Sequence, residues 1–98
     1  MLILPIKKKW FDMIKSGEKK EEYREIKPYW TSRFEHYLRR TIFNSYAGHV
    51  ILKNGYKKNS PTLKCVVNIT KGQGKEELGA EPNREYYILQ ILNIENNT

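Results

Sequence analysis

The chain has 98 residues, enough for one compact domain and too few for a second of ordinary size. With 39% hydrophobic and 30% charged residues, it can build one small core, which argues against a large cofactor cleft. The 18 lysine and arginine residues outnumber the 11 aspartate and glutamate residues, giving a net charge of +7. That charge favours a polyanionic partner, because contact with phosphates releases counterions. A merely soluble basic protein would have the same charge, so the charge alone does not identify the partner.

Cys65 is the only cysteine, so the sequence excludes an intramolecular disulfide and a cysteine-based metal site. This usage is typical of a reducing cytoplasm. The apolar residues 1–6 precede the first lysines, whereas a secretory signal has its positive charges first. No apolar run approaches the roughly 18 residues that span a bilayer. We therefore expect a cytoplasmic protein without a membrane partner.

The first half of the chain predicts alternating short strands and helices. Residues 2–6 predict a buried strand, and residues 8–16 place apolar side chains at helical spacing before Gly17, which is typical of left-handed helix ends. Residues 19–26 have helix-forming composition, but only the length of a strand remains between Gly17 and the next proline, so we expect a strand here. Residues 28–40 then predict an amphipathic helix that begins with this proline.

The second half predicts mostly sheet. Residues 49–52 are a strand candidate, and Asn54-Gly55 is a strong turn signal. Residues 62–70 alternate apolar and polar side chains, and Gly72-Gln73-Gly74 is expected to break that strand. Residues 86–94 predict a long final strand.

These elements favour an α+β fold built on a small, mixed, mostly antiparallel β-barrel with two or three flanking helices. Residues 1–95 are expected to form this single domain. The polar residues 96–98 are expected to form a frayed tail.

The densest polar cluster is the segment 17–24, Gly-Glu-Lys-Lys-Glu-Glu-Tyr-Arg. If this segment is extended, Glu22 and Arg24 project from the same face, because side chains alternate along a strand. With Lys19 at the preceding turn, the carboxylate can hold the arginine fork ready for a planar or phosphate-bearing ligand. The alternative is a solvated ion-pair strand that stabilises little and has no further role.

Gly17, Lys19, Glu22 and Arg24 fit the pattern G-x-K-x-x-E-x-R. This pattern resembles the signature of the ASCH domain family, relatives of the PUA domain. The likeness continues through residues 25–34, covers nearly the whole chain, and is strongest to the small stand-alone ASCH proteins of bacteria and their phages. It implies a PUA-like barrel with a helix-lined cleft and a role in binding RNA or another nucleic acid.

Carried over by residue, the resemblance implies that Lys19, Glu22 and Arg24 face the cleft, and that Gly17 is structural because it allows a sharp turn. Lysine and arginine can donate to phosphates or base edges, and a glutamate can accept from an exocyclic amine. The expected partner is RNA, another nucleic acid or a nucleotide-like small ligand, and no cofactor is implied. Arg84 is expected to lie outside the cleft.

Aromatic and basic residues interleave in two further segments, 27–33 and 53–58. An exposed ring can stack on a base while neighbouring cations hold the phosphate backbone. Trp30 is expected to pack in the core instead. The additional nucleic-acid-binding candidates are Tyr29, Arg33, Lys53 and Tyr56.

Two other classes of function stay open. A subgroup of small ASCH proteins that resembles this chain acts as an amidohydrolase on acetylated cytidine, with a threonine nucleophile where this chain has Glu22, which carries no hydroxyl. For a ribonuclease, Lys19 and Glu22 are the catalytic candidates, as electrostatic stabiliser and general base. A basic face that binds an acidic protein is the remaining alternative.

Three other features predict no chemistry. Residues 72–75 lack the first half of a phosphate-binding loop, which excludes a nucleoside triphosphate site of that kind. His36 and His49 have no metal-ligand spacing around them, so no metal site is expected. Cys65 lies on the apolar face of its strand and is expected to be an inert core thiol.

Overall fold

The computed structural model describes residues 2–38 and 46–95, and within these residues five strands form one sheet. The strands are β1 (Leu2–Pro5), β2 (Glu21–Glu25), β3 (Tyr46–Lys53), β4 (Thr62–Gln73) and β5 (Glu85–Glu95). The helical elements are α1 (Lys8–Ser16), α2 (Pro28–Leu38) and the short 3₁₀ helix η1 (Glu76–Leu78). The expected small α+β fold is therefore confirmed.

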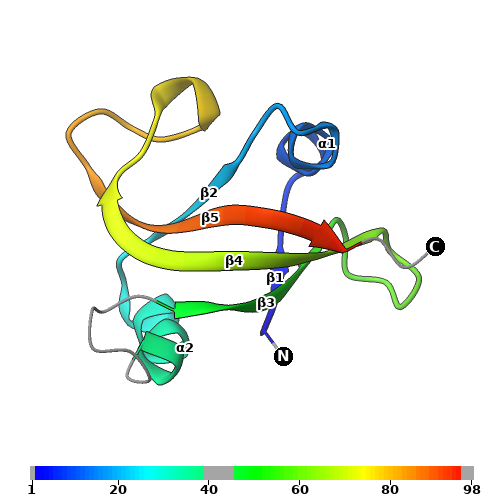
Figure 1. Cartoon of the computed structure of the whole chain (residues 1–98), viewed down its shortest axis with the longest axis horizontal. Helices are drawn as coiled ribbons and strands as arrows, with labels where there is room; N and C mark the ends of the chain where they lie inside the picture. The colour runs from blue at the N-terminus through cyan, green and yellow to red at the C-terminus, as the bar shows by residue number, and fades with distance from the viewer. Residues whose placement is uncertain (1, 39–45, 96–98) are drawn as a thin grey trace.

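The sheet has the strand order β1-β3-β4-β5-β2. β1 is parallel to β3, and the other neighbouring pairs are antiparallel, as expected. The long strands β4 and β5 curve together, so that the sheet curls into a half-barrel with β1 and β2 at its two edges (Figure 1). A register shift between Val66 and Val67 interrupts the β4–β5 ladder, and such bulges increase local twist.

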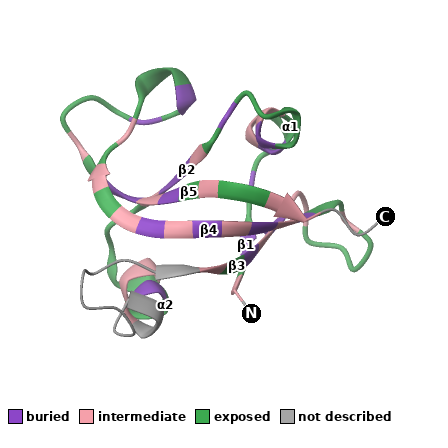
Figure 2. Cartoon of the chain, viewed as in Figure 1, coloured by how far each residue is buried: buried purple, intermediate pink, exposed green. Residues whose placement is uncertain are grey.

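Alternation along β4 builds the main core. Leu63, Cys65, Val67 and Ile69 are all buried, which confirms the predicted apolar face. Figure 2 shows this alternation as buried and half-buried segments that follow one another along the strand. Burial raises the pKa of the Cys65 thiol to about 11, as suits an inert core residue.

The two α-helices attach to this core through apolar side chains. α1 buries Phe11 and Ile14 and ends at Gly17, whose φ of 87° lies in the left-handed region and whose N–H donates to the Ile14 carbonyl. α2 buries Phe34, whose ring contacts the Tyr87 ring with centroids 4.9 Å apart. Neither these helices nor any other in the described part of the chain has the length and apolarity to cross a membrane.

The strand predicted within residues 19–26 is confirmed by β2, and the break predicted over residues 72–74 comes at the last of them, Gly74. β4 continues to Gln73, and Gly72 pairs with Tyr86 of β5. The neighbouring strand supplies ladder partners, so a glycine inside β4 does not end it. Residues 39 and 40 of the predicted second helix, and the predicted tail, lie outside the described residues.

The chain leaves the sheet only at Gly74, where the connection that carries η1 begins. A Cβ on Gly74 would lie 2.7 Å from the Ala80 Cβ and 2.8 Å from the Tyr23 Cζ, so only glycine fits there. This connection packs against Tyr23 as part of a second apolar cluster, with Leu78, Ala80 and Tyr86. In Figure 1 this connection lies beyond the β2 edge of the sheet, whereas Phe11 and Ile14 of α1 and Phe34 of α2 all belong to the main core cluster.

Candidate nucleic-acid interface

The three charged residues of the predicted signature converge on one point at the start of β2. The Lys19 Nζ lies 3.2 Å from the Glu22 Oε1, and the Arg24 Nη1 donates to the other carboxylate oxygen of Glu22. Glu22 and Arg24 share a face because they are two residues apart in a strand, as predicted. Their side chains are nevertheless largely buried, with exposed fractions of 1% for Lys19, 5% for Glu22 and 12% for Arg24.

Lys19 is a buried cation that joins β2 to the β4–β5 connection. Its ammonium donates to the Leu78 carbonyl and lies 4.2 Å from the ring centroid of Trp10 and 5.1 Å from that of Tyr23. Burial lowers the pKa of Lys19, and the Glu22 carboxylate acts in the opposite direction. Lys19 is therefore a buried structural cation that does not present its charge to solvent.

Arg24 bridges the two edge strands of the half-barrel. Its guanidinium donates to Glu22, to the Tyr23 carbonyl on its own strand, and to the Pro5 carbonyl at the end of β1. These bonds use three of the five N–H groups of the guanidinium, and the described residues accept from neither of the other two. Arg24 thus has donors left for a ligand while Glu22 holds it in place.

A hollow of about 410 Å³ opens beside Arg24, and we call it the central hollow. Lys19 and Glu22, which were also expected to face the cleft, do not line it, because their side chains are buried behind Arg24. It lies between the β1–α1 link, β2, the start of α2 and the segment that leads into β5. Its four aromatic side chains are Trp10, Tyr23, Trp30 and Tyr86. Its four basic side chains are Lys7, Arg24, Lys27 and Arg84. Its acidic side chains are Glu25 and Glu81.

The rim of the central hollow carries mixed charge. Arg84 lies 3.2 Å from Glu25 and 3.1 Å from Glu81, and Lys27 lies 3.8 Å from Glu25. The expectation that Arg84 lies outside the cleft is therefore wrong, because the β4–β5 connection folds back beside β2. Lys7 makes no ion pair with any residue that the structure describes.

Trp30 contacts both the hydrophobic core and the central hollow. Its ring stacks on Phe34 with centroids 5.7 Å apart, which joins it to the core as expected. It also lines the central hollow, where its centroid lies 5.4 Å from the Arg24 guanidinium carbon. The core packing fixes the ring, and its hollow-facing part is available to a ligand.

Tyr23 fixes the opposite wall. Its hydroxyl accepts from the Lys75 N–H at 3.0 Å and donates to Glu21 at 2.8 Å. Burial raises the pKa of Tyr23 to about 12, so the hydroxyl keeps its proton at neutral pH. Gly79, with a φ of 106°, brings the connection against Trp10, where a Cβ would lie 3.0 Å from the indole.

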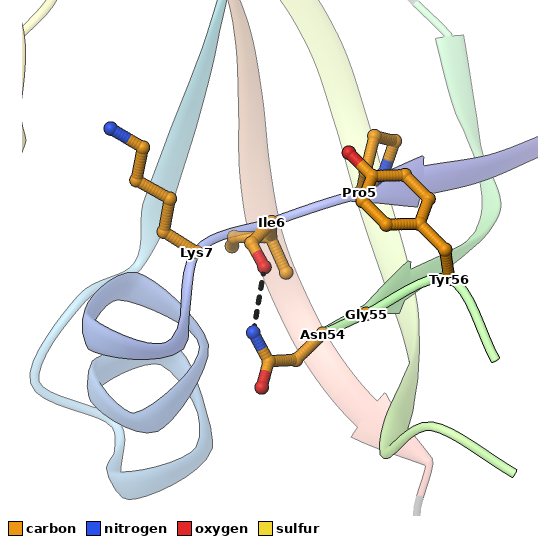
Figure 3. A pocket seen from close by; sticks show the side chains of 6 residues that line it. All are labelled: Pro5, Ile6, Lys7, Asn54, Gly55 and Tyr56. Carbon is orange, nitrogen blue, oxygen red and sulfur yellow. Dashed lines mark hydrogen bonds between the residues drawn. The ribbon is translucent and has the colours of Figure 1, made fainter.

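A smaller hollow of about 360 Å³ adjoins the central one, and we call it the side hollow. Both hollows share the wall Pro5–Lys7, and the side hollow adds the turn residues 54–56. Figure 3 shows Lys7 and Tyr56 on opposite sides of it, with the hydrogen bond from Asn54 to the Ile6 carbonyl between them. The predicted candidate Tyr56 is 91% exposed here.

The other predicted candidates lie elsewhere. Tyr29 and Arg33 are on α2, where the Arg33 guanidinium stacks over the Tyr29 ring at 3.6 Å, and neither residue lines a described hollow. Lys53 ends β3, pairs with Pro5 and Thr62, and also lines neither hollow. Gly17 has the structural role expected of it, at the end of α1.

Sequence reasoning missed most of the central hollow. Trp10 falls on the apolar stripe of its helix, so the pattern alone does not distinguish it from a core residue. Tyr86 and Arg84 belong to the last strand and its approach, and only the fold of the connection brings them to β2. A basic residue within two positions of an aromatic residue could have indicated these two sites in the sequence. Lys9 precedes Trp10, and Arg84 lies two residues before Tyr86.

Comparison with known proteins gives no match to a family model, to a curated protein or to a solved structure. Among the described residues, no three histidine, cysteine, aspartate or glutamate side chains gather as a metal site would require. The candidate site therefore rests on its own geometry.

Proposed function

We propose that this chain is a nucleic-acid-binding module of the ASCH type, on a PUA-like barrel, with RNA in the cytoplasm as its expected partner. In this proposal an unpaired base enters the central hollow, and the adjoining phosphates lie on its basic rim. The observation that carries the proposal is the presence of four aromatic and four basic side chains around one concave site.

This combination matches what a nucleotide offers. Stacking on an aromatic side chain contributes roughly 1–3 kcal/mol per base, and lysine and arginine neutralise phosphates. The hollow of about 410 Å³ is near the lower end of the size usual for small-ligand sites, roughly 300–1,000 Å³, which suits one nucleotide rather than a duplex.

The rim carboxylates argue for selectivity. A site that only attracts phosphates gains nothing from Glu25 and Glu81, which repel them. Each carboxylate can accept a hydrogen bond from the exocyclic amine of a base, as acidic side chains do for cytosine. In the proposed site, Arg24 keeps the binding role predicted for it, while Lys19 and Glu22 position Arg24 from below.

The hydrolase alternative receives less support from this geometry. A general base must come within hydrogen-bond reach of its substrate. Glu22 instead holds Lys19 and Arg24, with only 5% of its side chain exposed. A binding function uses the same cluster without any rearrangement.

Fluorescence anisotropy with a labelled twelve-nucleotide single-stranded RNA, its DNA equivalent and a duplex tests the proposal. Both single strands should bind, and the duplex should bind more weakly because its bases are not available for stacking. The logarithm of affinity should fall with the logarithm of salt concentration, by about 0.7 per phosphate contact.

Arg84→Ala is the sharpest variant, because Arg24 also bridges the two edge strands of the half-barrel and its loss would disturb folding. Removing Arg84 deletes a rim cation, leaves Glu81 without its ion-pair partner and leaves Glu25 with Lys27 alone, so affinity should fall by about tenfold. Lys15→Ala is the matched control, because this exposed lysine lines neither hollow. Equal losses from the two variants, or affinity that does not depend on salt, would contradict the proposal.

A further inference from the structure

The central hollow and the side hollow have one wall in common, the ridge Pro5–Lys7. We infer that the two hollows bind consecutive nucleotides of one single strand, with Lys7 holding the phosphate that links them. This inference rests on the proposed function and adds the length and path of the ligand.

The ridge is narrow enough for one nucleotide step. The same three consecutive residues line both hollows, so a single stretch of backbone separates them, which one phosphodiester link can cross. A nucleotide seated in the central hollow therefore has its neighbour within reach of the side hollow.

The ridge is also rigid. The Ile6 N–H donates to the Lys53 carbonyl, and the Ile6 carbonyl accepts from the Asn54 Nδ2, each at 3.0 Å. The Ile6 side chain is itself buried in the core. The two hydrogen bonds tie the ridge to the end of β3, and Arg24 of β2 donates to the Pro5 carbonyl from the other edge, so the two hollows keep a fixed separation.

Tyr56 supplies the stacking surface of the side hollow. Its ring is 91% exposed, so the core gains almost nothing from its size. Gly55, with a φ of 122°, presents it, and a Cβ on Gly55 would lie 2.6 Å from the Ser60 Oγ. A large amphipathic ring on a turn that only glycine can form is well placed to cover a base.

Lys7 stands where the linking phosphate would pass. It lines both hollows and is exposed, and the described residues give it no carboxylate partner. Its neighbours are differently engaged, because Lys8 pairs with Asp12 at 2.6 Å and Lys9 lies over the Trp10 ring at 4.6 Å. Lys7 is therefore the lysine of this run that is free to meet a phosphate.

Titrations with a nucleoside and with the corresponding dinucleoside monophosphate separate the two hollows. Cytidine and adenosine, with their dinucleoside forms, serve as probes, and binding is followed by NMR shifts of backbone amides. The dinucleoside should bind at least five times more tightly than the nucleoside, since one stacked base is worth roughly 5- to 150-fold.

The Tyr56→Ala variant should lose this gain and keep the nucleoside affinity, whereas Tyr56→Phe should retain both. Lys7→Ala should weaken the dinucleoside several-fold, and by a larger factor than it weakens the nucleoside, and should lower the salt dependence of dinucleoside binding. Leu92→Ala and Lys57→Ala are the controls, because both residues are exposed and line neither hollow.

Failure of this inference is distinguishable from failure of the proposed function. If the twelve-nucleotide strand binds at the central hollow but Tyr56→Ala and Lys7→Ala behave like the controls, only the two-nucleotide path is overturned. If no single strand binds the unaltered protein, the proposed function and this inference fall together.

Discussion

Glu22 is the counter-charge of two cations that the fold has taken out of water. It lies between Lys19 and Arg24, and all three side chains are at most 12% exposed. Removing one partner of a buried ion pair is strongly destabilising, because the remaining charge stays desolvated. The cluster is therefore a structural support as well as the base of the proposed site.

We expect Glu22→Gln to lower the free energy of unfolding by about 3 kcal/mol, measured by urea denaturation. Glu18→Gln removes the same charge from an exposed position and should change it by less than about 0.5 kcal/mol. The double variant Lys19→Met/Glu22→Gln should lose less than the sum of its single changes, because it removes both charges of a pair. A Glu22→Gln variant as stable as Glu18→Gln would show that the cluster does not stabilise the fold.

For individual residues, the sequence predicted that Glu22 and Arg24 are neighbours, but it did not predict that the cluster is buried. Period-two alternation was enough to bring Glu22 and Arg24 to one face. The burial of Lys19 depends on Leu78 and Trp10, which approach from other elements, and local patterns contain no information about such contacts. A lysine among charged residues accordingly looked like a cleft residue, and proved to be a buried cation.

Among the elements, the β4–β5 connection does most to shape the candidate site. It carries Gly79 and Glu81, leads to Arg84, and receives the hydrogen bond from Lys19 to the Leu78 carbonyl. Its position depends on the close approach of its first residue, Gly74, to Tyr23 and Ala80. A change at Gly74 should therefore move one wall of the central hollow.

Gly74→Ala should destabilise the protein by about 1–3 kcal/mol, because its Cβ would meet the Tyr23 ring and the Ala80 Cβ. The same variant should bind single-stranded nucleic acid more weakly. Gly72→Ala is the control, since its Cβ would meet only the end of the Ile88 side chain, at 3.2 Å. Denaturation and anisotropy measurements check both effects, and equal behaviour of the two variants would refute the role assigned to the connection.

The elements themselves were largely predictable. Apolar spacing predicted α1, and alternation predicted β4, because each pattern follows from the face that is buried. The extension of β4 through Gly72 was missed, since it depends on pairing with β5. Pairing of β5 with β2, in which Tyr86 lies opposite Glu25, places Arg84 beside β2, which is why its expected position was wrong.

For the whole molecule, the charge of +7 and the central hollow have separate roles in the proposed function. The net charge attracts a polyanion over a distance and raises the rate of encounter. The central hollow determines which ligand binds. Its lining includes Glu25 and Glu81 beside the cations, so a ligand needs hydrogen-bond donors as well as negative charge. The sequence predicted the attraction from composition, whereas the shape of the hollow comes from five separate segments.

Both tryptophans of the chain, Trp10 and Trp30, line the central hollow, where a base of the single strand is proposed to bind. Tryptophan emission, followed during titration with the twelve-nucleotide strand, therefore reports directly on this hollow. Emission should change in step with the anisotropy of the strand, and Trp10→Phe and Trp30→Phe should each retain a ligand-dependent signal from the remaining indole. Binding seen by anisotropy while the emission of all three proteins stays constant would place the ligand elsewhere and refute binding in the central hollow.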